Sequence, residues 1–398
     1  MRLTIKTPAD VAATVPVLLG FEPTDSLVVL AVGGERGSGP HLRVDHPHDA
    51  SSVLEVATVI GETAARHGTA ETVWVLVSYT EDQNDARDAL LGVAAVLTTG
   101  TIGPVLQITR TTDDPGENND GTQVGRWIDH GDLLDPETDA QMVRGLHAAG
   151  ILTRPSGPIT QADHDRVTAP VVAAGRRAPA PSREDAGAHL QPTARDRAGH
   201  HAMADLIASV RTDRARLYSG LNTQVTREGG SGEWQREEAR WLRAQVAQWR
   251  TDRVRVDDQA VARIAADVGI GVLRDVVTGD LSRSTASIDH DLWADIARRV
   301  PAEHATIPLI LAGLTAWLYG HGALAWIACD QVRHHAPGEA SARVDEFGLA
   351  GILHDVLAAG MPPSAWDDLA SVFCDDPSAA AGTSKRPDAA GAKSPHRG

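Results

Sequence analysis

Lysine is almost absent from this chain of 398 residues, which has only Lys6, Lys385 and Lys393. A P-loop needs a lysine on the nucleotide phosphates, a protein kinase needs one on a strand, and a Schiff-base enzyme needs a lysine amine. Two of the three lysines lie in a C-terminal segment of low complexity, and Lys6 precedes Thr7 and Pro8 in a setting that fits none of these sites. The sequence therefore excludes these three classes of enzyme.

Cysteine is equally rare, since the chain contains only Cys329 and Cys374 and no Cys-x-x-Cys spacing. Thiolate zinc sites, iron–sulfur clusters and a disulfide framework are therefore excluded within the chain. Histidines at a zinc-binding spacing such as HExxH are missing as well. We accordingly predict no cofactor and no metal ion.

An excess of positive charge is also missing. The formal net charge is −16, and no basic stretch exceeds two consecutive arginines, whereas a nucleic-acid-binding protein needs a basic patch. The longest apolar helical stretch, residues 307–328, contains Pro308 and His321, which indicates buried helices and not a membrane span. Residues 1–20 lack the basic start and apolar run of a signal peptide. We expect a cytoplasmic protein that binds neither nucleic acid nor membranes.

Aromatic residues make up only 4% of the chain, and most of them are tryptophan. The cores must therefore consist mainly of alanine, valine, leucine and isoleucine. A length of 398 residues favours two domains. We predict an α/β domain, a linker rich in Ala, Pro and Arg, a helical domain and a disordered tail, at residues 1–165, 166–200, 201–374 and 375–398.

The α/β domain is predicted from alternating strand and helix patterns. Runs of apolar, β-branched residues predict buried strands, and apolar residues at helical spacing predict the helices between them. The expected strands are 27–32, 41–45, 72–77 and 105–109, and the expected helices are 8–19, 53–66 and 83–97. The first two strands form a hairpin. A strand, a helix and a strand of these lengths make a βαβ crossover, so the sheet is mixed, with one parallel pair.

The second half shows helical patterns throughout. Helices 303–318 and 323–335 flank Gly320-His321-Gly322, and three positions match a 34-residue tetratricopeptide unit. Neighbouring windows do not repeat the match, so we predict one tetratricopeptide-like helix pair and no solenoid. A further helix, 233–251, carries three tryptophans on one face, which indicates a core position or, alternatively, a docking face for a partner.

Several motifs resemble those of an actinobacterial family of domains of unknown function, numbered four-one-nine-two. They are Pro16-x-Leu18-Leu19-Gly20-Phe21-x-Pro23-x-Asp25-Ser26-Leu27, Leu42-Arg43-Val44-Asp45-x-Pro47 and Ala316-Trp317-Leu318-x-Gly320-x-Gly322. The resemblance covers both halves and implies no chemistry, because the family has no assigned activity. The family commonly has cysteines after the position of Arg126-Trp127, which are missing here, and an Asp where this chain has His321.

Polar residues at the strand ends are the candidate ligand-binding groups. Arg43 and Asp45 share one face of a strand, where Arg43 can bind an anion and Asp45 can act as a base. The alternative is an ion pair on a solvated face. Ser78 follows the strongest strand, at the end where open α/β sheets bind ligands. Thr80 and Gln83 are alternatively a capping box for the next helix.

The segment Asp45-His46-Pro47-His48-Asp49 is rich in metal-ligating side chains. With His130 or Asp132 nearby it could hold a metal ion. Consecutive residues on a strand point to opposite faces, however, so we favour a solvated loop.

These observations support two functional hypotheses of different classes. In the first, which we favour, the protein is not a catalyst. Its helical half binds a protein partner, and its α/β half binds a ligand or supports dimerisation. The partner-binding residues are predicted as Trp317, Gly320, His321 and Gly322, and the ligand-binding residues as Asp25, Ser26, Arg43, Asp45 and Ser78. In the second, the protein is a hydrolase or transferase with a pocket at the carboxyl ends of the N-terminal strands. No nucleophile–base pair, metal triad or phosphate loop can be named, which favours the first.

Overall fold

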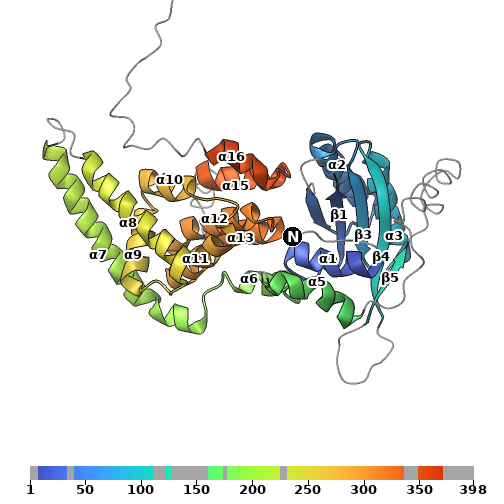
Figure 1. The fold of residues 1–398 in the computed structure, drawn as a ribbon, viewed down its shortest axis with the longest axis horizontal. Helices are drawn as coiled ribbons and strands as arrows, with labels where there is room; N and C mark the ends of the chain where they lie inside the picture. Colours follow the sequence, from blue (N-terminus) through green and yellow to red (C-terminus); the bar gives the residue numbers. More distant parts are fainter. Residues whose placement is uncertain are drawn as a thin grey trace, which may run out of the picture.

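The protein is elongated, with a β-sheet at one end and a larger group of helices at the other (Figure 1). The computed structural model describes residues 8–33, 40–111, 122–127, 160–173, 177–224, 231–335 and 348–370. The predicted tail, His130 and Asp132 lie outside these residues. Within them, none of the helices combines the length and the apolar composition that crossing a membrane requires.

The sheet has the strand order β2-β1-β3-β4-β5. Its strands are β1 (Ser26–Val32), β2 (His41–Asp45), β3 (Val73–Tyr79), β4 (Thr101–Thr111) and β5 (Thr122–Trp127). β1 runs antiparallel to β2 and β3, β3 runs parallel to β4, and β4 runs antiparallel to β5. This arrangement confirms the predicted hairpin and the parallel pair, because α3 (Gln83–Val96) carries the chain back between β3 and β4.

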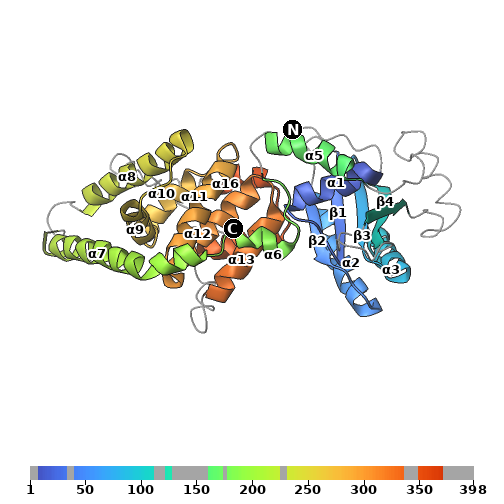
Figure 2. The ribbon, with the colours of Figure 1, turned by 90° about the horizontal axis from the view of Figure 1, so that it is seen from below.

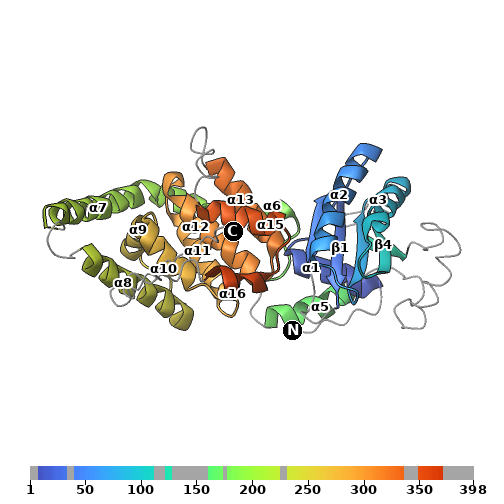
Figure 3. The same cartoon turned by 90° about the horizontal axis from the view of Figure 1, so that it is seen from above.

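Helices lie on both faces of this sheet (Figures 2 and 3). α2 (Ala50–His67) and α3 cover one face, and α1 (Pro8–Leu19) covers the other. Alternate residues of β1 divide between the two cores. Leu27 and Val29 pack toward α2 and α3, whereas Val28 belongs to the core on the α1 side. The continuous apolar run of β1 therefore reflects burial on both faces.

The segment predicted as a linker contacts both halves of the molecule. α5 (Gln161–Ala173) packs on α1 through a small apolar cluster, so the predicted boundary at residue 165 falls inside a helix of the sheet-bearing half. Residues 177–193, which we call the connector, pair through Ala180 with Phe21 at the end of α1. Leu190 of the connector is 2% exposed. Buried apolar side chains thus hold the connector in place. Their spacing is too irregular to give a periodic pattern in the sequence. The division into separately folding domains stays a prediction.

The C-terminal half is helical, as predicted, in the part of the chain that the structure describes. Its helices are α6 (Arg183–Ala188), α7 (Ala194–Gln224), α8 (Ser231–Asp252), α9 (Asp258–Asp267), α10 (Gly271–Gly279), α11 (Ala286–Arg299), α12 (Ala302–Leu318), α13 (Gly322–His335), α15 (Gly348–Ala358), the 3-10 turn Pro363–Ala365 and α16 (Trp366–Leu369). The three tryptophans of α8 are half-buried and pack against the main core, which favours the core interpretation. α12 and α13 lie side by side, but their likeness to a tetratricopeptide pair stays a prediction.

The two halves meet along a shared apolar core. A single cluster of buried residues runs from the α1 face of the sheet through Phe21 into α11, α12 and α13. A second contact joins α2 to the C-terminal region, where the Nε2 atom of His67 lies 2.7 Å from the carbonyl oxygen of Ala359. Buried side chains from both halves form this contact, so the junction between the halves has a defined structure.

Candidate functional sites

The ligand-binding residues predicted from the sequence gather at one edge of the sheet. We call this group the sheet-edge site, and it comprises Asp25, Ser26, Arg43, Asp45, His46, His48 and Ser78. β1 begins where β2 and β3 end, and the register places Ser26 opposite both Asp45 and Tyr79. The antiparallel pairing therefore brings together residues that are up to about 50 positions apart in the chain.

Arg43 is tied to its neighbours in this site. Its Nε atom donates a hydrogen bond of 3.0 Å to Oγ of Ser26, and its guanidinium contacts the carboxylate of Asp45. The side chain of Arg43 is 17% exposed, whereas that of Asp45 is 84% exposed. Arg43 and Asp45 thus form an ion pair within one strand, and its acid is exposed. This geometry resembles the ion pair on a solvated face that the sequence offered as the alternative to an anion-binding site.

His46 and Ser78 form a buried imidazole–hydroxyl pair. The Nε2 atom of His46 lies 2.9 Å from Oγ of Ser78, and its Nδ1 atom lies 3.0 Å from the carbonyl oxygen of Pro47. The carbonyl can only accept, so Nδ1 carries the hydrogen and Nε2 accepts from the serine hydroxyl. Burial lowers the pKa of His46. Ser78 is fully buried, so this pair does not present an open nucleophile.

His48 lies on the exposed side of the same site. Its Nδ1 atom is 2.9 Å from Oδ2 of Asp85 in α3, and its Nε2 atom is 3.1 Å from Oδ2 of Asp25. Hydrogen bonds to Asp85 and Asp25 raise the pKa of His48. Asp25, His46 and His48 each offer one ligand atom, and these atoms lie within 4.8 Å of one another.

Two sequence arguments about this region need correction. His46 and His48 follow the last residue of β2, so the alternation of side chains along a strand does not separate them. The capping box of Thr80 and Gln83 is wrong, because Asp82 is the N-cap of α3 and accepts from the backbone nitrogens of Asn84 and Asp85. The helix begins directly after Asp82, so Thr80 lies two residues too early to cap it.

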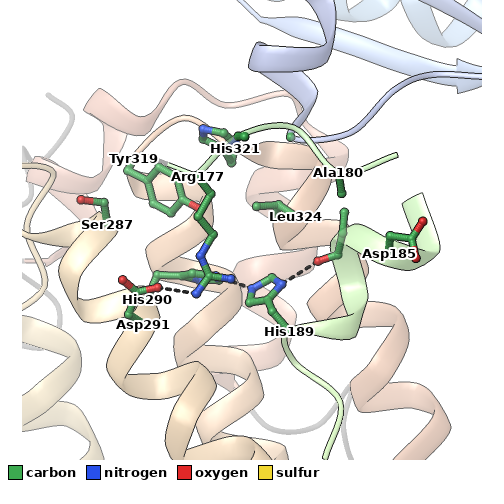
Figure 4. A pocket seen from close by; sticks show the side chains of 13 residues that line it. Arg177, Ala180, Asp185, His189, Ser287, His290, Asp291, Tyr319, His321 and Leu324 are labelled. Atoms are coloured by element: carbon green, nitrogen blue, oxygen red, sulfur yellow. Dashed lines mark hydrogen bonds and ion pairs between the residues drawn. The ribbon is translucent and has the colours of Figure 1, made fainter. Parts of the chain in front are cut away.

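A second site lies where the two halves meet. We call it the junction cavity; it has a volume of about 120 Å³ and lies beside the end of α1, the connector, α11 and the turn from α12 to α13 (Figure 4). Its polar and aromatic lining residues include Arg177, Asp185, His189, Ser287, His290, Asp291, Tyr319 and His321. The sequence pointed only to His321 among them, because the lining residues come from four separate segments between Gly20 and Leu324.

Two histidines face each other in this cavity. The Nε2 atoms of His189 and His290 are 2.8 Å apart. The Nδ1 atom of His189 lies 2.6 Å from the carbonyl oxygen of Ala186, and that of His290 lies 2.9 Å from the carbonyl oxygen of Ala312. These three contacts need three hydrogens, but two neutral imidazoles carry only two. A pair with every contact satisfied would therefore carry one positive charge.

The surroundings oppose that charge. Burial, together with electrostatic repulsion from His290, Arg177 and Arg298, lowers the pKa of His189 to about 3. Burial likewise lowers the pKa of His290 to about 4. The pair is thus neutral at neutral pH, and one of its three contacts lacks a hydrogen.

Arg177 stands at the open side of the cavity. It donates to Oδ1 of Asp291 over 2.7 Å, and its side chain is 51% exposed. Tyr319 forms an aromatic wall beside it, with its ring centroid 4.5 Å from that of His321 and 5.6 Å from that of His290. The cavity therefore combines a half-exposed guanidinium with imidazole and phenol rings.

The residues predicted to bind a partner occupy different environments. Trp317 is 3% exposed, and its indole nitrogen donates to the carbonyl oxygen of Met361. Gly320 is exposed and has a φ of +93°, which the tight turn requires. His321 is buried in the junction cavity, and Gly322 begins α13. Partner binding through these residues stays a prediction.

The family model described as "Domain of unknown function (DUF4192)" matches residues 8–364. The chain therefore belongs to this family, and the resemblance found in the sequence is confirmed. No curated protein and no solved structure matches the chain. Because the family description names no activity, a functional proposal depends on the geometry of the two sites.

Proposed function

We propose that the protein binds a small anionic metabolite in the junction cavity and acts through binding, without catalysing a reaction. The observation that supports this is the half-exposed guanidinium of Arg177, which lines the cavity together with the carboxylates of Asp185 and Asp291. Arg177 faces the cavity directly, and both Arg177 and Arg298 disfavour protonation of His189. A guanidinium that is open to solvent can bind a carboxylate or phosphate through its free N–H donors.

Arg177 can hold such a ligand without losing its present partner. A guanidinium has five N–H donors, and only one contact to Asp291 is made at 2.7 Å. The ligand's negative charge would also stabilise a third proton on the His189–His290 pair. That proton would complete the three contacts of the pair, so anion binding and proton uptake are expected to occur together.

The place of the cavity supports a binding role. Its walls belong to Gly20 at the end of α1, the connector, α11, the turn from α12 to α13 and α13, and ligand pockets occur preferentially between domains. A cavity of about 120 Å³ has room for several non-hydrogen atoms, because one water needs only about 10–15 Å³. A ligand held there would strengthen the contact between the two halves.

Thermal-shift measurements with a panel of small carboxylates and phosphates test this proposal. A ligand at 100 times its Kd adds about 2.7 kcal/mol to the free energy of unfolding, which is readily detected. We expect stabilisation of the wild-type protein that is stronger at pH 6 than at pH 8, and its loss in Arg177→Ala. Arg183→Ala is the matched control, because Arg183 also lies in the connector and pairs with Asp330 at 2.6 Å, away from the cavity.

Two results would contradict the proposal. One is that no anion of the panel stabilises the wild-type protein. The other is that Arg177→Ala keeps the full stabilisation, which would place the ligand elsewhere.

A further inference from the structure

We propose that the sheet-edge site binds one divalent transition-metal ion, of the class to which Zn²⁺ belongs, through Asp25, His46 and His48. This proposal is independent of the junction cavity. It reverses the expectation from the sequence that the chain holds no metal ion, because the structure assembles a ligand set that the linear spacing does not reveal.

The three ligand atoms have the separation that a shared ion requires. They lie within 4.8 Å of one another, and Nε2 of His48 is 3.1 Å from Oδ2 of Asp25. Two ligands at about 2.0–2.2 Å from a tetrahedral zinc ion are roughly 3.4 Å apart. Small side-chain rotations are therefore sufficient to place an ion between them.

Both histidines are already oriented as metal ligands usually are. Metal-bound imidazoles generally donate their second N–H to a carboxylate or a backbone carbonyl, which fixes the ring and its tautomer. Nδ1 of His48 faces the carboxylate of Asp85, and Nδ1 of His46 faces the carbonyl oxygen of Pro47. In each ring Nε2 is thus the atom that would bind the metal, which would displace the hydrogen bond from Ser78 at His46 and the proton shared with Asp25 at His48. Asp85, on α3, is a positioning residue in this arrangement.

The backbone holds the third ligand in place. Asp25 has a φ of +43°, in the left-handed region that aspartate adopts only when its surroundings favour it. Its carbonyl oxygen accepts a hydrogen bond of 3.0 Å from the backbone nitrogen of His46. One ligand-bearing residue is therefore tied directly to another, and both keep their relative positions without an ion.

The exposure of the ligands indicates an open site. His46 is buried, but the side chains of His48 and Asp25 are 51% and 63% exposed. Three protein ligands with a side open to solvent leave at least one coordination position for water or a ligand. An ion on Nε2 of His46 would replace the hydrogen bond from Ser78, so removal of that hydroxyl should not weaken metal binding.

The donor atoms determine the class of ion. Two imidazole nitrogens and one carboxylate suit Zn²⁺, Ni²⁺, Co²⁺ or Fe²⁺. Mg²⁺ and Ca²⁺ prefer oxygen ligands throughout, so they should not compete.

Isothermal titration of the metal-stripped full-length protein with Zn²⁺ tests the site, with Mg²⁺ as the negative control. We expect one Zn²⁺ per chain. His48→Ala and Asp25→Asn should each weaken binding at least about tenfold, and Asp85→Asn should weaken it about 10–100-fold. Ser78→Ala should bind as tightly as the wild type. His201→Ala is the matched control, because His201 is an exposed histidine beside Asp205 in the helical half.

The results that would overturn the proposal are distinct. They are an absence of stoichiometric Zn²⁺ binding by the wild type, or equal losses in His48→Ala and His201→Ala, which would mean scattered surface binding. Asp25→Asn guards against a folding artefact, because asparagine tolerates the left-handed backbone, and a thermal melt verifies each variant. Arg177→Ala should bind Zn²⁺ normally, so failure of this proposal is separable from failure of the anion-binding proposal.

Discussion

The two halves of the molecule place their charged groups differently. At the sheet edge, Asp25, Asp45 and His48 have side chains that are 51–84% exposed. In the helical half, Glu238 is 2% exposed and Asp267 and Asp289 are fully buried. The sheet edge leaves these three side chains in solvent, where they can meet a ligand. The helices pack over their charged residues, so these residues serve the packing. Substitutions should therefore reduce binding in the first half and stability in the second.

Glu238 and Asp267 illustrate the buried kind. Glu238 on α8 accepts two hydrogen bonds, of 2.6 and 2.9 Å, from Arg263 of α9, and it contacts Arg214 of α7. Burial, with the contact to Glu238, raises the pKa of Asp267 to about 8. Asp267 is therefore mostly protonated at neutral pH, whereas Glu238 carries the negative charge that balances two arginines.

The largest effect is expected from Glu238→Gln, which leaves Arg263 without its counter-charge and Arg214 with only its contact of 3.3 Å to Asp267. Breaking a buried ion pair in this way costs about 3–5 kcal/mol. Asp267→Asn is the control, because an amide resembles a protonated carboxyl, and we expect a loss below about 1 kcal/mol at pH 7. Urea denaturation measures both. Equal losses would mean that Glu238 and Asp267 share the negative charge, and not that Glu238 carries it alone.

The second effect is acid sensitivity that arises at the junction of the halves. The pKa of His290 is about 4 in the folded protein, against 6.5 as its ordinary value. Below pH 6.5 the unfolded chain binds the proton first, so stability falls as the pH falls toward 4. The loss is on the order of 2–3 kcal/mol between pH 7 and pH 4.

His290→Gln should flatten that slope, because glutamine can still donate to the carbonyl of Ala312 and does not titrate. The measurement is the free energy of unfolding at pH 7, 5 and 4 for both proteins. His41 in the sheet, whose pKa burial also lowers to about 4, should keep part of the slope in the variant. An unchanged slope in His290→Gln would assign the acid sensitivity to the other histidines of lowered pKa, His189 and His41.

A smaller effect is expected at Gly20, which ends α1 with a φ of +85°. A Cβ atom there would lie 3.2 Å from Nδ1 of His321 and 3.4 Å from Cγ of Leu324. Gly20→Ala should cost about 1–2 kcal/mol from the left-handed backbone, and it should also weaken anion binding in the junction cavity. Gly199→Ala, in α7 with open space around it, should instead stabilise by about 0.5–1 kcal/mol. Differential scanning calorimetry distinguishes the two, and a stabilised Gly20→Ala would refute the expectation.

The smallest effect is expected at the exposed edge. Asp45→Asn removes an ion pair whose acid is 84% exposed, and Arg43 keeps its hydrogen bond to Ser26. Such pairs contribute less than about 1 kcal/mol, and salt should reduce even that. Denaturation at low and high ionic strength measures it. A loss above about 2 kcal/mol would show that the sheet edge is coupled as strongly as the helical half.

The sequence by itself determined the local elements of both halves. The hairpin, the βαβ crossover and the helical C-terminal half follow from apolar periodicity, which acts over a few residues and is visible in any short window. It also determined that Arg43 and Asp45 share a face, since this depends only on strand alternation. The packing of the connector against both halves was not predicted, because its apolar residues, such as Leu190, are not periodically spaced.

The tertiary structure alone decided which polar groups meet. Ser78 lies beside His46 because β1 pairs with both β2 and β3, and Asp85 reaches His48 because α3 starts at the same edge. His189 meets His290, 101 residues later, only because the connector packs on α11. These contacts depend on register and on the packing of distant segments, which no local pattern in the chain encodes.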